Sequence, residues 1–445
     1  MVDTCDDRRM SSLPLAWTGG PTCARRSPRC ANVIAGTPEV RVHVFARRFP
    51  SLSQTFVLNQ CTGLLDLGVD VTVFADGADA TGLTQPDAVA GRLMDRIRHY
   101  AIPEPWSHRP LPALQLMATA SSLSMRQRLA LIAPWRGGAE SRSGRLLFEG
   151  AAVAREPKSD VLHAHFGPVG AMVQSLRDAR VLDAPLVTTF YGYDVSRTPA
   201  SRYRALFRGG DAFLVLGEAM RARLLAMGAP PERVHVHRLG VDLGRFAPSG
   251  RARSPNAESV LHLLSIARLV PKKGIADALC AVARARARVA SLRYTIIGDG
   301  PLRAELERLA SSLGIADVVD FAGWKTQQDV LAIARTARVV LAPSVTAPDG
   351  DAEGTPVAIL EAQALAIPVI ATHHAGIPEV VVDGETAILA KEHDVEALAS
   401  AIVALADPQR SQRMGEAGRA LVERQHDIRR LNEALLARFE SLTCP

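Results

Sequence analysis

The sequence has few of the residues and patterns that would point to nucleic acid, to a membrane span or to secretion. Aromatic residues make up only 5% of the 445 residues, and no stretch interleaves them with arginine, so nucleic-acid binding is not expected. No run of about 18 uncharged apolar residues occurs, so no membrane-spanning helix is expected. The chain begins with acidic residues before a short apolar patch, which is the wrong order for a secretory signal. These absences favour a globular cytoplasmic protein.

Cysteine pairs are also lacking. The six cysteines are scattered along the chain, and none forms a C-x-x-C pair, so neither a disulfide framework nor a zinc site is expected. The net charge of +6 leaves anionic small substrates and a membrane surface open as partners.

The order of strand-like and helix-like segments indicates two domains of the α/β class. A chain of 445 residues exceeds what one hydrophobic core usually supports. Alternation of the two patterns predicts a parallel sheet covered by helices, and it occurs twice along the chain. We therefore expect two doubly wound, Rossmann-like domains with a cleft between them. In chain order, the expected parts are a disordered arm (1–38), an N-terminal domain (39–242), a linker (243–258), a C-terminal domain (259–410) and a helical segment packing back toward the N-terminal domain (411–445).

Residues 92–158 are less regular and carry a surplus of positive charge. They contain eleven Arg or Lys against five Asp or Glu, with leucines and arginines mixed at helical spacing. One interpretation is a helix packed on its own domain. The other is a basic, partly apolar surface that touches anionic lipid.

The stretch "PSVTAPDGDAEGTPVAILEA" (343–362) places four carboxylates around a Thr-Pro dipeptide. Thr355 followed by Pro356 is typical of a helix N-cap and first helical residue, so a helix is predicted to run to about Ala366. The N–H groups and dipole at the start of such a helix attract anions. Glu361 would lie within the helix among apolar neighbours, where a lone carboxylate needs a partner.

Five sequence motifs resemble those of the retaining GT-B glycosyltransferases of family 4, and they occur in the expected order along the chain. Glu353 and Glu361 are eight residues apart in E-G-T-P-V-A-I-L-E, which matches the signature of that family. The motifs look most like those of the subgroup that builds colanic-acid-type exopolysaccharides; they are "RRFPSLSQTFVLNQ", "HAHFGP", "TTFYGYDVS", "ARLVPKKG" and "SVTAPDGDAEGTP". The resemblance spans nearly everything from residue 40 to the end, and it implies the GT-B architecture of two Rossmann-like domains facing across a cleft.

The resemblance implies catalytic roles for four residues. Glu353 would hold hydroxyls of the donor hexose, and Arg268 and Lys273 would clamp the donor diphosphate. Two cations on one loop would neutralise the charge that builds on the leaving group. His165 would lie near the donor sugar, although its spacing from His163 on one strand is equally typical of a core residue.

The resemblance also implies a donor site on the C-terminal domain. Glu361 would accept hydrogen bonds from the ribose hydroxyls. The segment "IIGDGP" is a weak dinucleotide fingerprint, because Arg303 stands where the third glycine is required. The residues expected near the sugar, diphosphate, ribose and base are Gly354, Thr355, Val357, Gly298, Gly300, Gly323 and Trp324.

On the N-terminal domain the acceptor-binding candidates are Asp194, Ser51 and Ser53. The segment "FYGYD" departs from the more frequent His-Gly-x-Asp by carrying Tyr191, and "FPSLSQ" stands where many relatives have a Gly-Gly turn.

The expected function is retaining transfer of a hexose from a nucleotide-diphosphate sugar, with UDP favoured over GDP, to a growing lipid-linked saccharide. No metal and no other cofactor are expected. A peripheral position on the inner face of the cytoplasmic membrane is the further expectation for a cytoplasmic protein of this kind. Two alternatives are a metal-dependent transferase that uses Asp349 and Asp351, and a non-catalytic sugar- or nucleotide-binding scaffold at the membrane.

Overall fold

The computed structural model describes residues 40–51, 54–78, 92–133, 143–248, 260–289 and 291–443. The expected arm (1–38), Ser53 and most of the expected linker lie outside these residues. The described residues belong to one compact unit that begins at Glu39. Both cysteines within them, Cys61 and Cys280, are free. No helix in the described part of the chain is long and apolar enough to cross a membrane.

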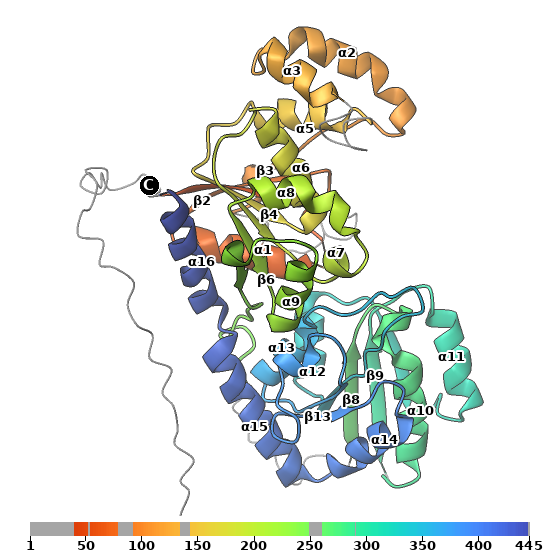
Figure 1. Cartoon of the computed structure of the whole chain (residues 1–445). Helices are drawn as coiled ribbons and strands as arrows, with labels where there is room; N and C mark the ends of the chain where they lie inside the picture. The colour runs from red at the N-terminus through yellow and green to blue at the C-terminus, as the bar shows by residue number, and fades with distance from the viewer. Residues whose placement is uncertain are drawn as a thin grey trace, which may run out of the picture. The chain divides into compact units, whose positions relative to one another are not determined.

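The N-terminal half is built on a seven-stranded parallel sheet with strand order β3-β2-β1-β4-β5-β6-β7 (Figure 1). Its strands are β1 (Arg41–Phe45), β2 (Asp70–Ala75), β3 (Ile97–His99), β4 (Val161–His165), β5 (Leu186–Thr189), β6 (Ala212–Val215) and β7 (Val234–Val236). The central strands are buried along their whole length, because helices cover both faces of a parallel sheet. The helices are α1 (Thr55–Asp66), α2 (Pro110–Thr119), α3 (Met125–Ile132), α5 (Arg145–Val153), α6 (Gly167–Asp178), α7 (Tyr193–Ser196), α8 (Arg204–Gly209) and α9 (Glu218–Ala226).

The C-terminal half repeats this plan with six parallel strands in the order β10-β9-β8-β11-β12-β13. Its strands are β8 (Leu261–Ile266), β9 (Leu292–Ile297), β10 (Val319–Gly323), β11 (Val339–Ala342), β12 (Val369–Thr372) and β13 (Ala387–Ala390). The helices around them are α10 (Ile275–Arg286), α11 (Arg303–Ser312), α12 (Gln327–Ala334), α13 (Val357–Ala364) and α14 (Val395–Ala404).

Two helices at the end of the chain connect the halves a second time (Figure 1). Helix α15 (Pro408–Gln425) packs on α13 in the C-terminal half, and α16 (Ile428–Thr443) packs on α1 and β4 in the N-terminal half. Phe439 of α16 is fully buried in the core that includes β1, and its ring centroid lies 5.5 Å from that of His163. The return to the N-terminal half therefore begins after His426, where the chain leaves α15.

The predicted α/β class with two doubly wound domains is confirmed. In each sheet the strand order reverses beside the first strand, between β1 and β4 and between β8 and β11. Open α/β sheets bind ligands beyond the carboxyl ends of the strands at such a reversal. The fold therefore offers two ligand-binding edges.

Candidate active site

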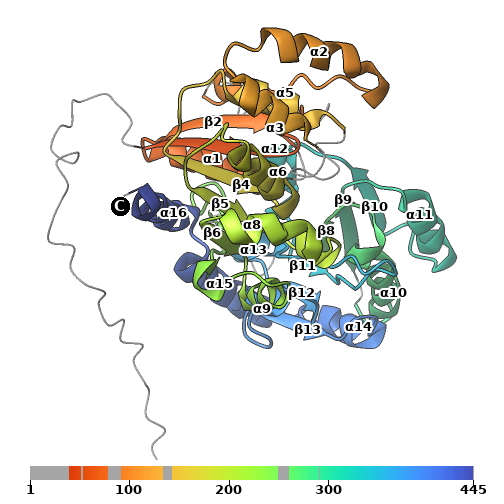
Figure 2. The same cartoon turned by 45° about the horizontal axis from the view of Figure 1, so that its top comes forward.

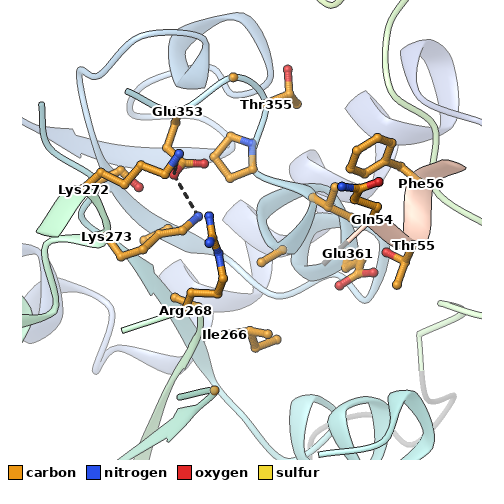
Figure 3. A pocket seen from close by; sticks show the side chains of 18 of the residues that line it. Gln54, Thr55, Phe56, Ile266, Arg268, Lys272, Lys273, Glu353, Thr355 and Glu361 are labelled. Carbon is orange, nitrogen blue, oxygen red and sulfur yellow. Dashed lines mark ion pairs between the residues drawn. The ribbon is translucent and has the colours of Figure 1, made fainter. Parts of the chain in front are cut away.

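A cavity of about 640 Å³ lies where the carboxyl ends of strands from both sheets meet (Figure 3). It is lined by Phe166 after β4, Arg268 after β8, Gly298 after β9 and Ser344 after β11. Among the described residues, five cationic side chains line it against three carboxylates, a surplus of two positive charges. Such a cavity favours an anionic ligand.

Glu353 is held in this cavity by lysines. Its Oε1 lies 2.9 Å from Nζ of Lys273 and 3.7 Å from Nζ of Lys272, and the side chain is 8% exposed (Figure 3). Burial alone would raise the pKa of Glu353, but the two ammonium groups outweigh it and hold the pKa below its usual value. Glu353 is therefore an ionised acceptor of hydrogen bonds at neutral pH and a poor proton donor.

The two aspartates of the same loop are committed to cations. Asp351 pairs with Lys272 at 3.2 Å, and Asp349 pairs with Arg197 of the N-terminal half at 2.6 Å. No group of three or more His, Cys, Asp or Glu side chains in the described ranges is arranged to hold a metal ion. Lys272, which the motif analysis did not single out, thus fixes the loop from Asp351 to Glu353.

A buried histidine supports the same loop, and sequence reasoning missed it. The backbone N–H of Glu353 donates to Nε2 of His374 at 3.0 Å, so the ring proton resides on Nδ1. Nδ1 in turn donates to Oε1 of Glu392 at 2.6 Å, and the other carboxylate oxygen of Glu392 accepts from the backbone N–H of Thr346. The only sequence signal was the pair His373 and His374 directly after β12, and nothing local shows which of the two faces the loop.

Helix α13 presents its first turn to the cavity. Thr355, Pro356, Val357 and Ala358 all line it. The expected N-cap role of Thr355 is wrong: Pro356 is the N-cap residue, and no side chain caps the helix. The helix also ends at Ala364, two residues before the expected end. Its first amides are therefore available to an anionic ligand in the cavity.

Glu361 lies one turn further along α13 and also lines the cavity. Burial among apolar neighbours raises its pKa to about 7, and the nearby Arg245 only partly opposes this. In the free protein Glu361 is therefore only partly ionised at neutral pH. The two glutamates of the motif thus have opposite electrostatic environments.

Arg268 is exposed after β8, and its charged end points to the same part of the cavity as that of Lys273 (Figure 3). The loop can hold both cations because Gly274 follows directly. Gly274 has φ +61°, and a Cβ atom there would lie 1.8 Å from the carbonyl oxygen of Pro343. The glycine lets the start of α10 approach the end of β11.

Four residues expected near the base and ribose divide into two groups. Gly298 and Trp324 line the cavity. Gly300 and Gly323 lie behind that surface: a Cβ on Gly300 would meet the backbone of Leu269, and the carbonyl of Gly323 accepts from the N–H of Gly298. These two glycines position neighbours that face the cavity.

The N-terminal half contributes an aromatic wall formed by Phe56, Phe166 and Tyr191. Ring centroids of Phe56 and Tyr191 are 4.5 Å apart, and those of Phe166 and Tyr191 are 4.7 Å apart. Gln54, Thr55 and Phe56, at the start of α1, line the cavity, whereas Ser51 is buried beside them. The described part of the motif "FPSLSQTF" therefore reaches the cavity through Gln54, Thr55 and Phe56 and not through Ser51, and Ser53 lies outside the described residues.

His165 lies behind this wall and is fully buried. Its Nδ1 is 2.7 Å from the hydroxyl oxygen of Tyr191, and burial lowers its pKa to about 3. Among the described residues, Tyr191 rather than His165 lines the cavity. The structure thus gives His165 contact with Tyr191 and no direct access to a ligand.

Asp194 is also fully buried and acts on the loop backbone. Oδ2 accepts from the N–H of Gly167 at 2.9 Å, and Oδ1 accepts from the N–H groups of Tyr191 and Gly192 at 2.9 Å each. Burial raises its pKa even though these hydrogen bonds favour the carboxylate. The expected contact of Asp194 with an acceptor is not supported by this placement, because the side chain holds the Tyr191 loop and does not line the cavity.

Both halves of the chain match families of known proteins. Residues 53–240 match the family described as a glycosyl transferase 4-like domain, and residues 249–421 match the family described as glycosyl transferases group 1. Over 384 residues the chain is 36% identical to WcaL, a glycosyltransferase assigned to colanic acid biosynthesis in Salmonella typhimurium, covering 81% of this chain and 89% of that protein. It is 33% identical over 386 residues to AmsK, an amylovoran biosynthesis glycosyltransferase of Erwinia amylovora, covering 82% and 90%. The crystal structure of Anabaena HepE with UDP and glucose has the same fold, with a TM-score of 0.68 at 16% identity over 90% of this chain and 100% of that one.

Proposed function

We propose that this protein is a retaining enzyme of exopolysaccharide biosynthesis. The chain belongs to the family of glycosyl transferases that combines a 4-like domain with a group 1 domain, and it is therefore a glycosyltransferase. The proposed donor is a UDP-hexose, and the proposed acceptor is a growing, lipid-linked saccharide. The relatives named for colanic acid and amylovoran biosynthesis support the pathway class. The resemblance of the motifs supports the donor and the acceptor.

One observation carries this proposal: the cavity combines an anion site with two glutamates, of which Glu353 is paired with Lys273 and Glu361 is buried among apolar side chains. Arg268, Lys273 and the first turn of α13 supply positive potential where a diphosphate would lie. Ionised Glu353 lies beside them and can accept hydrogen bonds from hexose hydroxyls. Glu361, one turn further along α13, can accept from a ribose.

In the proposed reaction the bond between C1 of the hexose and the diphosphate oxygen breaks. The bond between C1 and the acceptor oxygen forms on the same face of the ring, and the acceptor proton passes to the leaving diphosphate. The protein stabilises the developing charge and orients the reactants. Because Lys273 holds the carboxylate of Glu353, we assign that residue to orientation and not to nucleophilic attack.

We assign the acceptor sugar to the aromatic wall of Phe56, Phe166 and Tyr191. Aromatic rings can pack against the apolar C–H faces of a sugar, and the wall faces the C-terminal half across the cavity. We further propose that no metal is required. Arg268, Lys273 and the helix start already supply the positive charge, and both aspartates of the loop are paired with cations.

The test is a transfer assay with UDP-hexoses and GDP-hexoses, before and after treatment with EDTA. Thermal-shift measurements select the donor first, since a ligand at 100 times its Kd adds about 2.7 kcal/mol to the free energy of unfolding. We expect transfer from a UDP-hexose, unchanged by EDTA, with the product linked in the anomeric configuration of the donor. A product of inverted configuration, or loss of transfer on chelation that returns with added metal, would contradict the proposal.

The raised pKa of Glu361 predicts that donor binding depends on pH. The carboxylate form offers the acceptors for a ribose, and its fraction rises about tenfold between pH 6 and pH 8 for a pKa of about 7. We therefore expect the Kd of a UDP-hexose to fall by up to about tenfold over this range. A nucleotide sugar is the suitable probe, because it lacks the terminal phosphate that titrates in free UDP.

The Glu361→Gln variant is the control for this prediction. It keeps an acceptor but loses the charge, so it should bind the donor about 1–3 kcal/mol more weakly at pH 8 and show no pH dependence. It should also raise the free energy of unfolding above pH 7, where the native protein must keep a buried carboxylate ionised. A wild-type Kd that stays constant from pH 6 to 8 would show that Glu361 does not contact the donor.

A further inference from the structure

Large apolar side chains are exposed on one part of the N-terminal half. In the described chain, Met94 is 43% exposed, Trp106 73%, Leu111 67% and Leu114 68%. Met125, Leu129 and Ile132 follow at 56%, 53% and 40%, whereas only three other large apolar residues are as exposed, over the rest of the described chain. Isolated apolar residues on a surface are ordinary, but a concentration of this kind marks an interaction site.

Five of these side chains lie on the outer faces of α2 and α3, and Trp106 lies in the short turn Trp106–His108 directly before α2. Met94 precedes β3 and belongs to neither helix. Leu111, Leu114 and Ala118 recur at helical spacing on α2, and Met125, Leu129 and Ile132 do so on α3. The opposite faces pack inward through Leu116, Met117 and Leu131. Both helices contact α5; both lie at the outer edge of the N-terminal half in Figure 1, and α2 lies at that edge again in Figure 2. Helix α2 is therefore apolar on both of its faces.

Side-chain hydrogen bonds tie the two helices together in this position. Ser124 and Gln127 form a capping box at the start of α3. The guanidinium of Arg128 donates to the carbonyl oxygens of Met117, Ala120 and Leu123, which closes the end of α2. The exposed apolar face is therefore a defined surface of the fold.

The surplus of positive charge counted in residues 92–158 is largely cancelled by ion pairs in the structure. Six of the nine described cations there form ion pairs with carboxylates; they are Arg92, Arg96, Arg98, Arg109, Arg145 and Lys158. Most of these partners, such as Asp66, Asp70 and Asp76, lie outside the segment, so the counting of charges within it missed them. The positive charge of the expected basic, partly apolar surface is thus largely neutralised.

Helices α2 and α3 contain no carboxylate, and Glu104, which precedes Trp106, pairs with Arg109. Residues 105–133 contain no Asp or Glu, and the exposed side chains among them include Arg126 and His108. The surface is consequently apolar with a weakly positive fringe. This combination matches the boundary between acyl chains and anionic headgroups in a bilayer, where Trp and Leu insert and Arg remains at the surface.

We propose that the outer faces of α2 and α3 insert into the headgroup region of an anionic lipid bilayer and dock the enzyme there. Apolar insertion supplies most of the binding, and the few unneutralised cations add a minor electrostatic part. This docking surface lies outside the cavity and does not rest on the identity of the donor or acceptor.

Vesicle co-sedimentation of the full chain tests the proposal. Wild-type protein should bind vesicles of phosphatidylethanolamine with phosphatidylglycerol, and should bind phosphatidylcholine vesicles more weakly. Raising the salt concentration should reduce the binding only in part. A triple variant, Trp106→Ser, Leu111→Ser and Leu114→Ser, should lower the partition coefficient by at least about tenfold, because binding scales with the apolar area inserted.

Matched controls distinguish loss of membrane insertion from misfolding and from self-association as the cause of weaker vesicle binding. Val382→Ser removes a 42% exposed apolar side chain on the C-terminal half and should leave vesicle binding unchanged. If the triple variant melts early, Met125→Ser with Leu129→Ser on α3 provides a second test. Three results would each overturn the proposal: no vesicle binding by the wild type, equal binding by folded variants, or a concentration-dependent wild-type dimer that the variants abolish without any vesicle binding.

Discussion

Replacing Arg268 or Lys273 by alanine should lower turnover by roughly 10²–10³-fold, the scale for the loss of one charge-stabilising group. Both cations line the cavity beside the first turn of α13, where the leaving diphosphate would gather charge. Because that charge is greatest in the transition state, kcat should fall more than KM rises. Steady-state kinetics with the donor found by thermal shift provide the measurement.

Lys391→Ala is a matched control, because Lys391 is an exposed lysine of the same half that does not line the cavity. It should transfer at the wild-type rate. Lys273→Arg should recover part of the loss, since it restores the charge but not the compact ammonium group. Wild-type rates in a folded Arg268→Ala, Lys273→Ala double variant would rule out the assignment of these residues to the diphosphate.

Glu353→Gln should lower turnover by roughly 10²-fold, the cost of misplacing a reacting group by about 1 Å. The substitution keeps the size of the side chain but removes the charge that holds Lys273 at 2.9 Å. Both the sugar and the diphosphate clamp should therefore lose orientation. The measurement is kcat and KM for Glu353→Gln beside Glu361→Gln, which should raise KM and change kcat less.

The coupling of Glu353 with Lys273 gives a second readout. Removing either partner breaks the same ion pair, so the losses in Glu353→Gln and Lys273→Ala should not multiply in the double variant. Full multiplication would show that the two residues act independently. Loss confined to KM in Glu353→Gln would show that it serves binding alone.

Local sequence patterns determined the fold class and the loops that carry the chemistry. Buried parallel strands read as short runs of Val, Leu and Ile between helical periods, and this pattern does not depend on distant residues. The spacing of Glu353 and Glu361 also needs no tertiary information, since both lie on one loop-to-helix segment. The same holds for Arg268 and Lys273, which one short loop carries into the cavity.

Only the tertiary structure decided which of several similar residues faces the cavity. Nothing in the sequence distinguishes an exposed His165 from one covered by Tyr191, because that depends on how the "FYGYD" loop folds over β4. Asp194 could equally have bound a ligand or the backbone amides that it holds. His374 and Glu392 support Glu353 from 21 and 39 residues away, and no local pattern links them.

The charged residues of segment 92–158 also show which properties the sequence determined and which the tertiary structure decided. The sequence determined how many arginines residues 92–158 contain, and it also determined that residues 105–133 contain no carboxylate. It did not determine that Asp66, Asp70 and Asp76 neutralise three of those arginines, because the partners lie on other elements of the sheet and helices. Ion pairing depends on distances through space, and these exist only once β2 and α1 have packed beside the segment.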